Sequence, residues 1–179
     1  MRSSVTAAVC SGIECRNGPS VHAPPVAWAV ARFVQLLVDE QGAIAPEETG
    51  LIVASDECSL ALIRELSTTA SQGKVSPLRF AGASPSIVVG LPALQLALRG
   101  PSLCLTMPPA HARAAVAALI RYWTRNNSVS AVIAVAHYRL DEDRHLLKGL
   151  VARAGDLPTD AIAELCDSGA GRDRRPGFS

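Results

Sequence analysis

Cysteine and histidine are the residues of this chain best suited to nucleophilic or metal-binding chemistry, and both are scattered along it. The cysteines and histidines are Cys10, Cys15, Cys58, Cys104, Cys166, His22, His111, His137 and His145. No two cysteines have C-x-x-C spacing, whereas zinc sites need clustered thiolates or imidazoles. The sequence therefore predicts no metal site and no cofactor. An odd number of scattered thiols also predicts a reduced, cytoplasmic setting.

Each polar side chain has a structural role to weigh against a chemical one. Cys104 falls inside a short apolar segment, where cysteine usually acts as a small buried hydrophobe. His111 falls in the first turn of an expected helix, where an exposed histidine is commoner than a catalytic one. Carboxylates within 55–59 suit the positive N-terminal end of the next helix. We interpret His137 as structural and His145 as part of a charged, solvated stretch.

Composition excludes several classes of protein. The chain has 179 residues, a formal net charge of +1, 49% hydrophobic residues and 18% charged residues, which is too apolar for a disordered chain. A pI near 7.7 without a basic stripe argues against a nucleic-acid partner. The longest apolar run, 129–136, is far below the roughly 20 residues of a membrane span, and we expect no signal peptide. The mean hydropathy of +0.23 predicts apolar surface that a partner covers.

Expected strands and helices alternate along the chain. The strands are predicted at 3–10, 51–54, 103–106 and 130–138. The helices are predicted at 26–41, 59–70, 86–98 and 109–125, with 142–153 left open between helix and strand. This alternation predicts an α/β fold with a mixed, mostly parallel sheet and helices packed on it. We assign 1–154 to the domain and 155–179 to a largely flexible C-terminal tail that includes a short helix at 159–166.

Local signals mark two helix ends, and two helices carry unusually apolar faces. Ser59 is expected to cap the helix that follows it. Gly100, before Pro101, is expected to end the helix at 86–98 as its left-handed residue. The helices at 86–98 and 109–125 need cover from a second chain or from the segment 141–166 folded back.

Two motifs resemble β-ketoacyl synthases, which are members of the thiolase-fold family. Residues 76–80 read Ser-Pro-Leu-Arg-Phe before a helix, and residues 100–103 read Gly-Pro-Ser-Leu before a strand. In that family a Ser-Pro-x-x-Phe loop precedes a helix, and a Gly-Pro-Ser strand leads to the nucleophile elbow. The resemblance covers about residues 26–140 and implies the N-terminal half of a thiolase-type fold. It leaves the family's catalytic histidines, which lie in the C-terminal half, without counterparts.

The resemblance also marks a departure at the elbow. Counting on from the Gly-Pro-Ser-Leu motif, Pro109 stands where the family has its nucleophilic cysteine. That cysteine supplies a thiolate at a helix N-terminus and a backbone N–H for the oxyanion. Proline has neither group, although it is a suitable first residue of a helix. We therefore expect no catalytic residue, with His111 and Cys104 as the alternatives.

The resemblance further implies a partner. In the family the strand before the elbow pairs with the same strand of a second subunit, and here that strand is Leu103, Cys104, Leu105 and Thr106. We expect a truncated, condensation-inactive subunit, similar to a chain length factor, in polyketide or fatty-acyl biosynthesis. It would form a heterodimer with a full-length ketosynthase, or a homodimer, and work with an acyl carrier protein. The alternatives are a diverged enzyme acting on acyl thioesters or acyl-carrier-protein substrates, and a self-associating acyl-binding module. We expect neither nucleic acid nor a membrane as partner.

Overall fold

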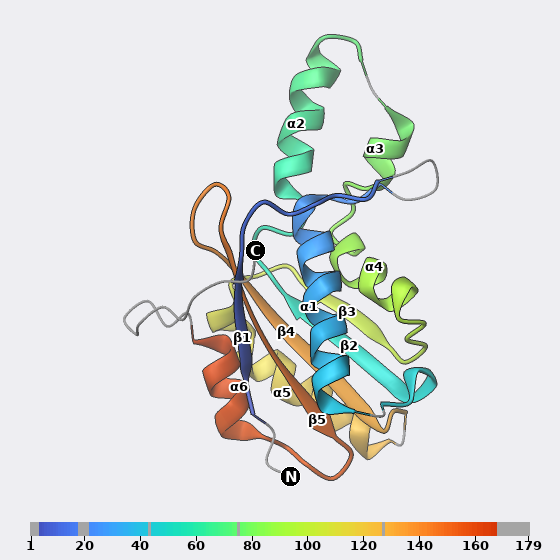
Figure 1. Ribbon diagram of the computed structural model, residues 1–179, viewed down its shortest axis with the longest axis vertical. Helices are drawn as coiled ribbons and strands as arrows, with labels where there is room; N and C mark the ends of the chain where they lie inside the picture. Colours follow the sequence, from blue (N-terminus) through green and yellow to red (C-terminus); the bar gives the residue numbers. More distant parts are fainter. Residues whose placement is uncertain (1–3, 18–21, 43, 75, 127, 168–179) are drawn as a thin grey trace.

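A five-stranded sheet lies between two layers of helices in the computed structural model, which describes residues 4–17, 22–42, 44–74, 76–126 and 128–167 (Figure 1). In chain order the strands are β1 (Thr6–Cys10), β2 (Thr49–Ala54), β3 (Ser102–Leu105), β4 (Ala131–Arg139) and β5 (His145–Arg153). The helices are α1 (Pro25–Gln41), α2 (Leu60–Ser71), α3 (Pro77–Ala81), α4 (Ile87–Gln95), α5 (Pro109–Arg125) and α6 (Thr159–Cys166), with a 3₁₀ turn at Pro46–Glu48. The predicted elements are thus present, and the open segment 142–153 contains a strand.

The sheet is mixed, with the order β1-β5-β4-β2-β3. β2 pairs in parallel with β3 and β4, whereas β5 pairs antiparallel with β4 and β1. Four of the five strands therefore run in one direction and β5 runs against them, which confirms the mixed, mostly parallel sheet. β3 is an edge strand, because β2 is its neighbour on one side and the sheet order ends there.

Side chains of the inner strands alternate between two apolar cores. Leu51 and Val53 of β2 pack toward α1 and α4, while Ile52 and Ala54 pack toward α5 and α6. β4 is buried along its length up to His137, which fits a strand covered on both faces. Its small alanines allow the helices to approach the sheet closely.

The end of α4 differs from the prediction. The helix ends at Gln95, and Ala97 adopts the left-handed conformation with φ +52°. The N–H of Leu98 donates to the carbonyl of Ala93, which closes a Schellman motif around Ala97. Gly100 was therefore wrongly expected to supply the left-handed residue. It is needed instead for close approach, because a Cβ there would lie 2.4 Å from the carbonyl oxygen of Thr49.

Ser59 also has another role than the one predicted. It precedes α2, but its side chain makes no capping hydrogen bond. Its hydroxyl donates instead to the carbonyl of Ala83, which ties the start of α2 to the segment before α4. In the turn before α2, Ser55 Oγ accepts from the N–H groups of Glu57 and Cys58.

The part of the expected tail that the structure describes packs on the domain. α6 lies against α5, and its buried side chains are Ala161, Ile162, Leu165 and Cys166. The hydroxyl of Tyr138 donates to the carbonyl of Leu165 over 2.8 Å, and Lys148 Nζ donates to the carbonyl of Asp167 over 2.7 Å. α6 therefore helps to cover α5, which agrees with the fold-back of 141–166 for that helix, whereas α4 packs against α1. Residues 168–179 lie outside the described part of the chain.

Candidate functional site

The connection from β3 to α5 forms the strand–turn–helix elbow that the sequence predicts. β3 ends at Leu105, Pro108 precedes the helix in an extended conformation, and Pro109 is its buried first residue. The carbonyl of Pro108 accepts from the N–H of His111 over 2.9 Å. Neither proline has a backbone N–H or a reactive side-chain atom, so this elbow offers a turn without a nucleophile.

A cavity of about 220 Å³ lies in front of this elbow. It is lined by Asp56, Glu57, Pro108, Pro109, Ala110, Tyr138 and Arg139. Arg139 Nη1 donates to Glu57 Oε1 over 2.8 Å, so the cation of the cavity is engaged by a carboxylate. Burial raises the pKa of Tyr138, and its phenol stays protonated as a donor to Leu165. The lining contains no serine, cysteine or histidine.

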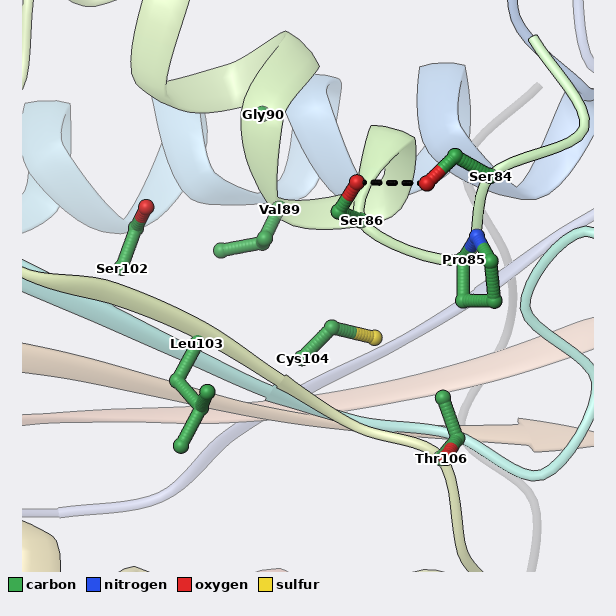
Figure 2. Close-up of a pocket in the computed structure, with 9 residues that line it drawn as sticks. All are labelled: Ser84, Pro85, Ser86, Val89, Gly90, Ser102, Leu103, Cys104 and Thr106. Atoms are coloured by element: carbon green, nitrogen blue, oxygen red, sulfur yellow. Dashed lines mark hydrogen bonds between the residues drawn. The ribbon is translucent and has the colours of Figure 1, made fainter. Parts of the chain in front are cut away.

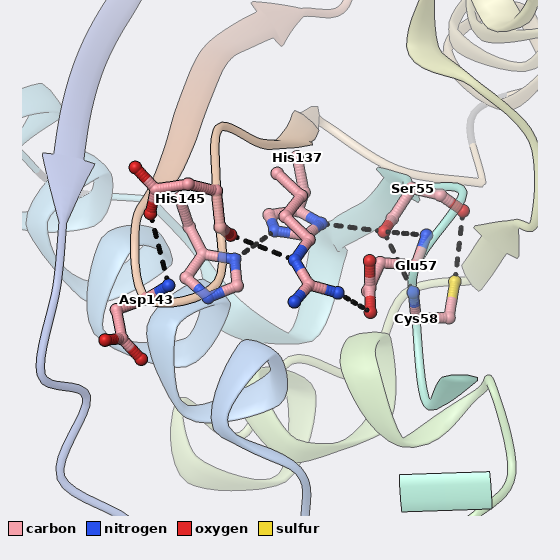
Figure 3. A network of polar contacts seen from close by, with 8 residues as sticks. Ser55, Glu57, Cys58, His137, Asp143 and His145 are labelled. Carbon is pink, nitrogen blue, oxygen red and sulfur yellow. Dashed lines mark hydrogen bonds and ion pairs between the residues drawn. The ribbon is translucent and has the colours of Figure 1, made fainter. Parts of the chain in front are cut away.

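Three polar side chains form a chain of hydrogen bonds in the interior, at one end of the sheet (Figure 3). Ser55 Oγ lies 2.8 Å from His137 Nδ1, and His137 Nε2 lies 2.9 Å from His145 Nδ1. Ser55 and His137 are fully buried and His145 is nearly so. Buried polar groups of this kind are costly unless each one is paired.

The hydrogen bonds assign the protons of this chain. Ser55 Oγ already accepts from two backbone N–H groups, so its own O–H donates to His137 Nδ1. His137 then carries its proton on Nε2 and donates it to Nδ1 of a neutral His145. Burial, followed by the proximity of His145 and Arg139, lowers the pKa of His137 to about 3. Both rings are thus neutral at pH 7, and the chain positions the turn after β2 rather than presenting a nucleophile to solvent.

A larger cavity, of about 460 Å³, opens beside the edge strand β3 (Figure 2). It is lined by Ser84, Pro85, Ser86, Val89, Gly90, Ser102, Leu103, Cys104 and Thr106. The thiol of Cys104 points into the space between β3 and the start of α4. Its Sγ lies 3.5 Å from Cys58 Sγ, and both cysteines are free thiols.

The main-chain groups of β3 face two ways. The carbonyls of Pro101 and Leu105 accept from N–H groups on the β2 side. Because backbone groups alternate along a strand, those of Ser102 and Cys104 point away from β2. Within the described residues no strand pairs with that side, so β3 has the open edge that strand pairing with another chain requires.

The two predicted site residues, His111 and Cys104, do not lie in one site, while other cysteine and histidine side chains are in contact. His111 is exposed on α5 and lines neither cavity, whereas Cys104 lines the cavity beside β3, and no cluster of metal-binding residues occurs in the described ranges. The contacts of Cys58 with Cys104 and of His137 with His145 were not predicted. A correctly predicted β4–β5 hairpin would have indicated the contact of His137 with His145. In that pairing Arg139 lies opposite His145, and His137 is two residues from Arg139 on the same face of β4.

Comparisons with known proteins define the fold. No protein-family model and no curated protein matches the sequence. A chain of a structure from Xenorhabdus doucetiae, described as the ketosynthase ApeO in complex with its chain length factor ApeC, is similar with a TM-score of 0.53 and 12% identity. The match covers 87% of this chain and 81% of that one, so the two chains have similar lengths.

A chain of the ishigamide ketosynthase/chain length factor is also similar, with a TM-score of 0.48 and 16% identity. That match covers 66% of this chain and 40% of the other chain, so this chain spans less than half of that protein's length.

The chain is thus an α/β protein with a mixed, mostly parallel sheet, as predicted. Its fold is similar to that of one chain in a structure of a ketosynthase with its chain length factor. Among the described helices none is long and apolar enough to cross a membrane.

Proposed function

We propose that this chain is a condensation-inactive subunit, similar to a chain length factor, that pairs through β3 with a full-length ketosynthase in polyketide or fatty-acyl biosynthesis. The observation that carries the proposal is the elbow between β3 and α5. It keeps the strand–turn–helix geometry while Pro109 removes both a thiol and a backbone N–H. An acyl carrier protein would deliver the growing acyl group to the ketosynthase partner, not to this subunit.

The edge strand supports the partner. β3 is short, Leu103 is 39% exposed, and none of its four residues is charged. Natural edge strands are usually protected against pairing with other chains by charged residues, proline or a covering segment. In β3 the nearest proline, Pro101, lies before the first residue of the strand. The similar structure from Xenorhabdus doucetiae is a complex of a ketosynthase with its chain length factor, which supports a ketosynthase as the second chain.

A diverged enzyme that uses His111 or Cys104 is the second candidate. Cys104 lines a cavity of a size that admits part of an acyl chain, which favours this interpretation. Against it, His111 does not line that cavity and so offers Cys104 no general base.

Copurification tests the proposal. The tagged chain is coexpressed with a full-length ketosynthase from the same biosynthetic locus and purified through its tag. Light scattering then gives the molar mass of the eluted species. We expect a heterodimer, or a homodimer when the chain is expressed alone. Leu103→Lys should weaken either dimer at least about tenfold, because it places a charge at the paired edge. Leu140→Lys, at a site that is 47% exposed beyond β4, is the matched control. A monomer in every mixture would contradict the proposal.

A mass-spectrometric assay separates the two candidates. The chain is incubated with malonyl- and acyl-carrier protein, and its mass is measured. The proposal expects no acyl adduct, and none after Pro109→Cys either. A stable adduct on Cys104 would favour the diverged enzyme.

A further inference from the structure

Two thiols from distant parts of the sequence meet beneath the cavity at β3. Cys58 lies in the turn before α2 and is buried, while Cys104 lies on β3 and is half-buried. Their sulfur atoms are 3.5 Å apart. A disulfide requires an S–S distance near 2.04 Å, so a movement of about 1.5 Å, within reach of side-chain rotation, would join them.

The surroundings of the pair favour thiolate chemistry at one sulfur. A hydrogen bond from Cys104 lowers the pKa of the Cys58 thiol, against the opposing effect of burial. The same contact, followed by burial, raises the pKa of Cys104. Cys58 is thus the more readily ionised of two adjacent thiols, and a second sulfur in contact with it can resolve the first one once that is oxidised.

Solvent reaches the pair from one side. Cys104 lines the open cavity of about 460 Å³ between β3 and the start of α4 (Figure 2). That space admits a small oxidant such as hydrogen peroxide to the side chain of Cys104, whose sulfur contacts that of the buried Cys58. On the inner side, the thiol of Cys58 donates to the carbonyl of Ser55 over 3.1 Å, which holds it beside Cys104.

We propose that Cys58 and Cys104 form a redox-modification site, which a small peroxide converts to an intrachain disulfide that ties the edge strand β3 to the turn before α2. One of the two sulfurs, once ionised, attacks one peroxide oxygen, the O–O bond breaks and hydroxide leaves, which gives a sulfenic acid. The second sulfur then attacks the sulfenic sulfur and expels its hydroxyl group. The leaving oxygens and the two thiol protons end as two water molecules. The two sulfurs lose two electrons in total and the peroxide accepts them.

Peptide mapping of the full-length chain tests this site. The native protein is treated with hydrogen peroxide, unfolded in the presence of iodoacetamide, and digested with trypsin without reduction. Trypsin places Cys58 in peptide 33–64 and Cys104 in peptide 100–113. We expect these two peptides to be linked, at least about tenfold more abundantly than any other cysteine pair, and to separate on treatment with dithiothreitol.

Two variants and one unfolded sample give the controls. Cys15→Ser, at an exposed cysteine, should leave the 33–64/100–113 link unchanged, whereas Cys104→Ser should abolish it. Protein unfolded in urea before oxidation should give mixed pairs. The inference is overturned if both native peptides remain alkylated after oxidation, if Cys58 or Cys104 ends as a sulfinic acid, or if the native and unfolded samples give the same pairs. If Cys104→Ser fails to fold, the peptide map of the unsubstituted protein alone still shows whether Cys58 and Cys104 form a disulfide.

Discussion

His137 Nε2 lies 2.9 Å from Nδ1 of His145, and the two rings stack with their centroids 5.1 Å apart. Two imidazolium rings in such contact would repel each other, and a charged ring would also have lost its hydration. The Ser55–His137–His145 chain is therefore matched to neutral histidines, and protonation of either one opposes folding.

This arrangement predicts a stability that falls in acid. The pKa of His137 is lowered to about 3, and burial together with Arg139 also lowers the pKa of His145, although Glu57, Asp141 and Asp143 raise it. Unfolded histidines titrate near 6.5, so the stabilisation is complete above that pH. It should decline as the pH drops from about 6.5 toward 3, by about 1.4 kcal/mol per pH unit for each histidine that must stay neutral.

Urea unfolding at pH 7.5, 6, 5 and about 4.5 measures this slope. His137→Gln, which keeps polar atoms but does not titrate, should lower stability at pH 7.5 and flatten the slope. His111→Gln, on the exposed face of α5, should leave both unchanged. An equal slope in the unsubstituted protein and in His137→Gln would contradict the assignment.

Gly100 and Gly90 predict opposite effects of the same substitution. A Cβ at Gly100 would lie 2.4 Å from the backbone oxygen of Thr49, which cannot move without disturbing the start of β2. Gly100→Ala should therefore destabilise by more than about 2 kcal/mol. A Cβ at Gly90 in α4 meets no atom within 4 Å, so Gly90→Ala should stabilise by about 0.5–1 kcal/mol. Thermal unfolding of both variants checks the pair, and a similar change in both would contradict it.

The same glycine shows what local signals can and cannot predict. The Gly100-Pro101 pair correctly indicates that no helix continues into β3. The close approach of Gly100 to Thr49, in contrast, is a contact across about 50 residues of sequence that no local signal predicts. α5 was predicted to the residue because Pro109 and its apolar spacing are local features.

The contacts at the site escaped prediction for a related reason. Cys58 meets Cys104 only because β2 and β3 pair in parallel with one register. His145 reads as solvated among the charged residues of 141–144, yet β4–β5 pairing turns it inward. The pattern of apolar residues predicted the layers, while sheet register determined which polar side chains meet.

Ile162 on α6 should be part of the domain core rather than of a tail. It is 1% exposed and packs in the same core as Val116 and Ile120 of α5. Ile162→Ala should destabilise by about 2–5 kcal/mol, and α5 amides should exchange faster with solvent deuterium. Ile63→Ala, at an α2 site that is 42% exposed, should change stability by less than about 0.5 kcal/mol. If Ile162→Ala unfolds like the unsubstituted protein, α6 is dispensable to the fold.

The final prediction concerns the main chain of β3, whose outward groups at Ser102 and Cys104 would bond a partner strand. Ser102→Pro removes an outward N–H and leaves the hydrogen bonds of Pro101 and Leu105 to the β2 side in place. The folded subunit should therefore persist, as circular dichroism can check. Its dimer with itself or with the ketosynthase should weaken at least about tenfold, equivalent to about 1.4 kcal/mol.

Ser102→Ala is the matched control, because it removes the hydroxyl and keeps the N–H. Sedimentation equilibrium of the three proteins gives the affinities, and alkylation of Cys104 gives an independent measurement. A strand paired with β3 should slow alkylation of Cys104, while exposed Cys15 reacts at an unchanged rate. If Ser102→Pro and Ser102→Ala associate equally well, the association does not use the edge of β3, and the subunit must meet its partner through another surface.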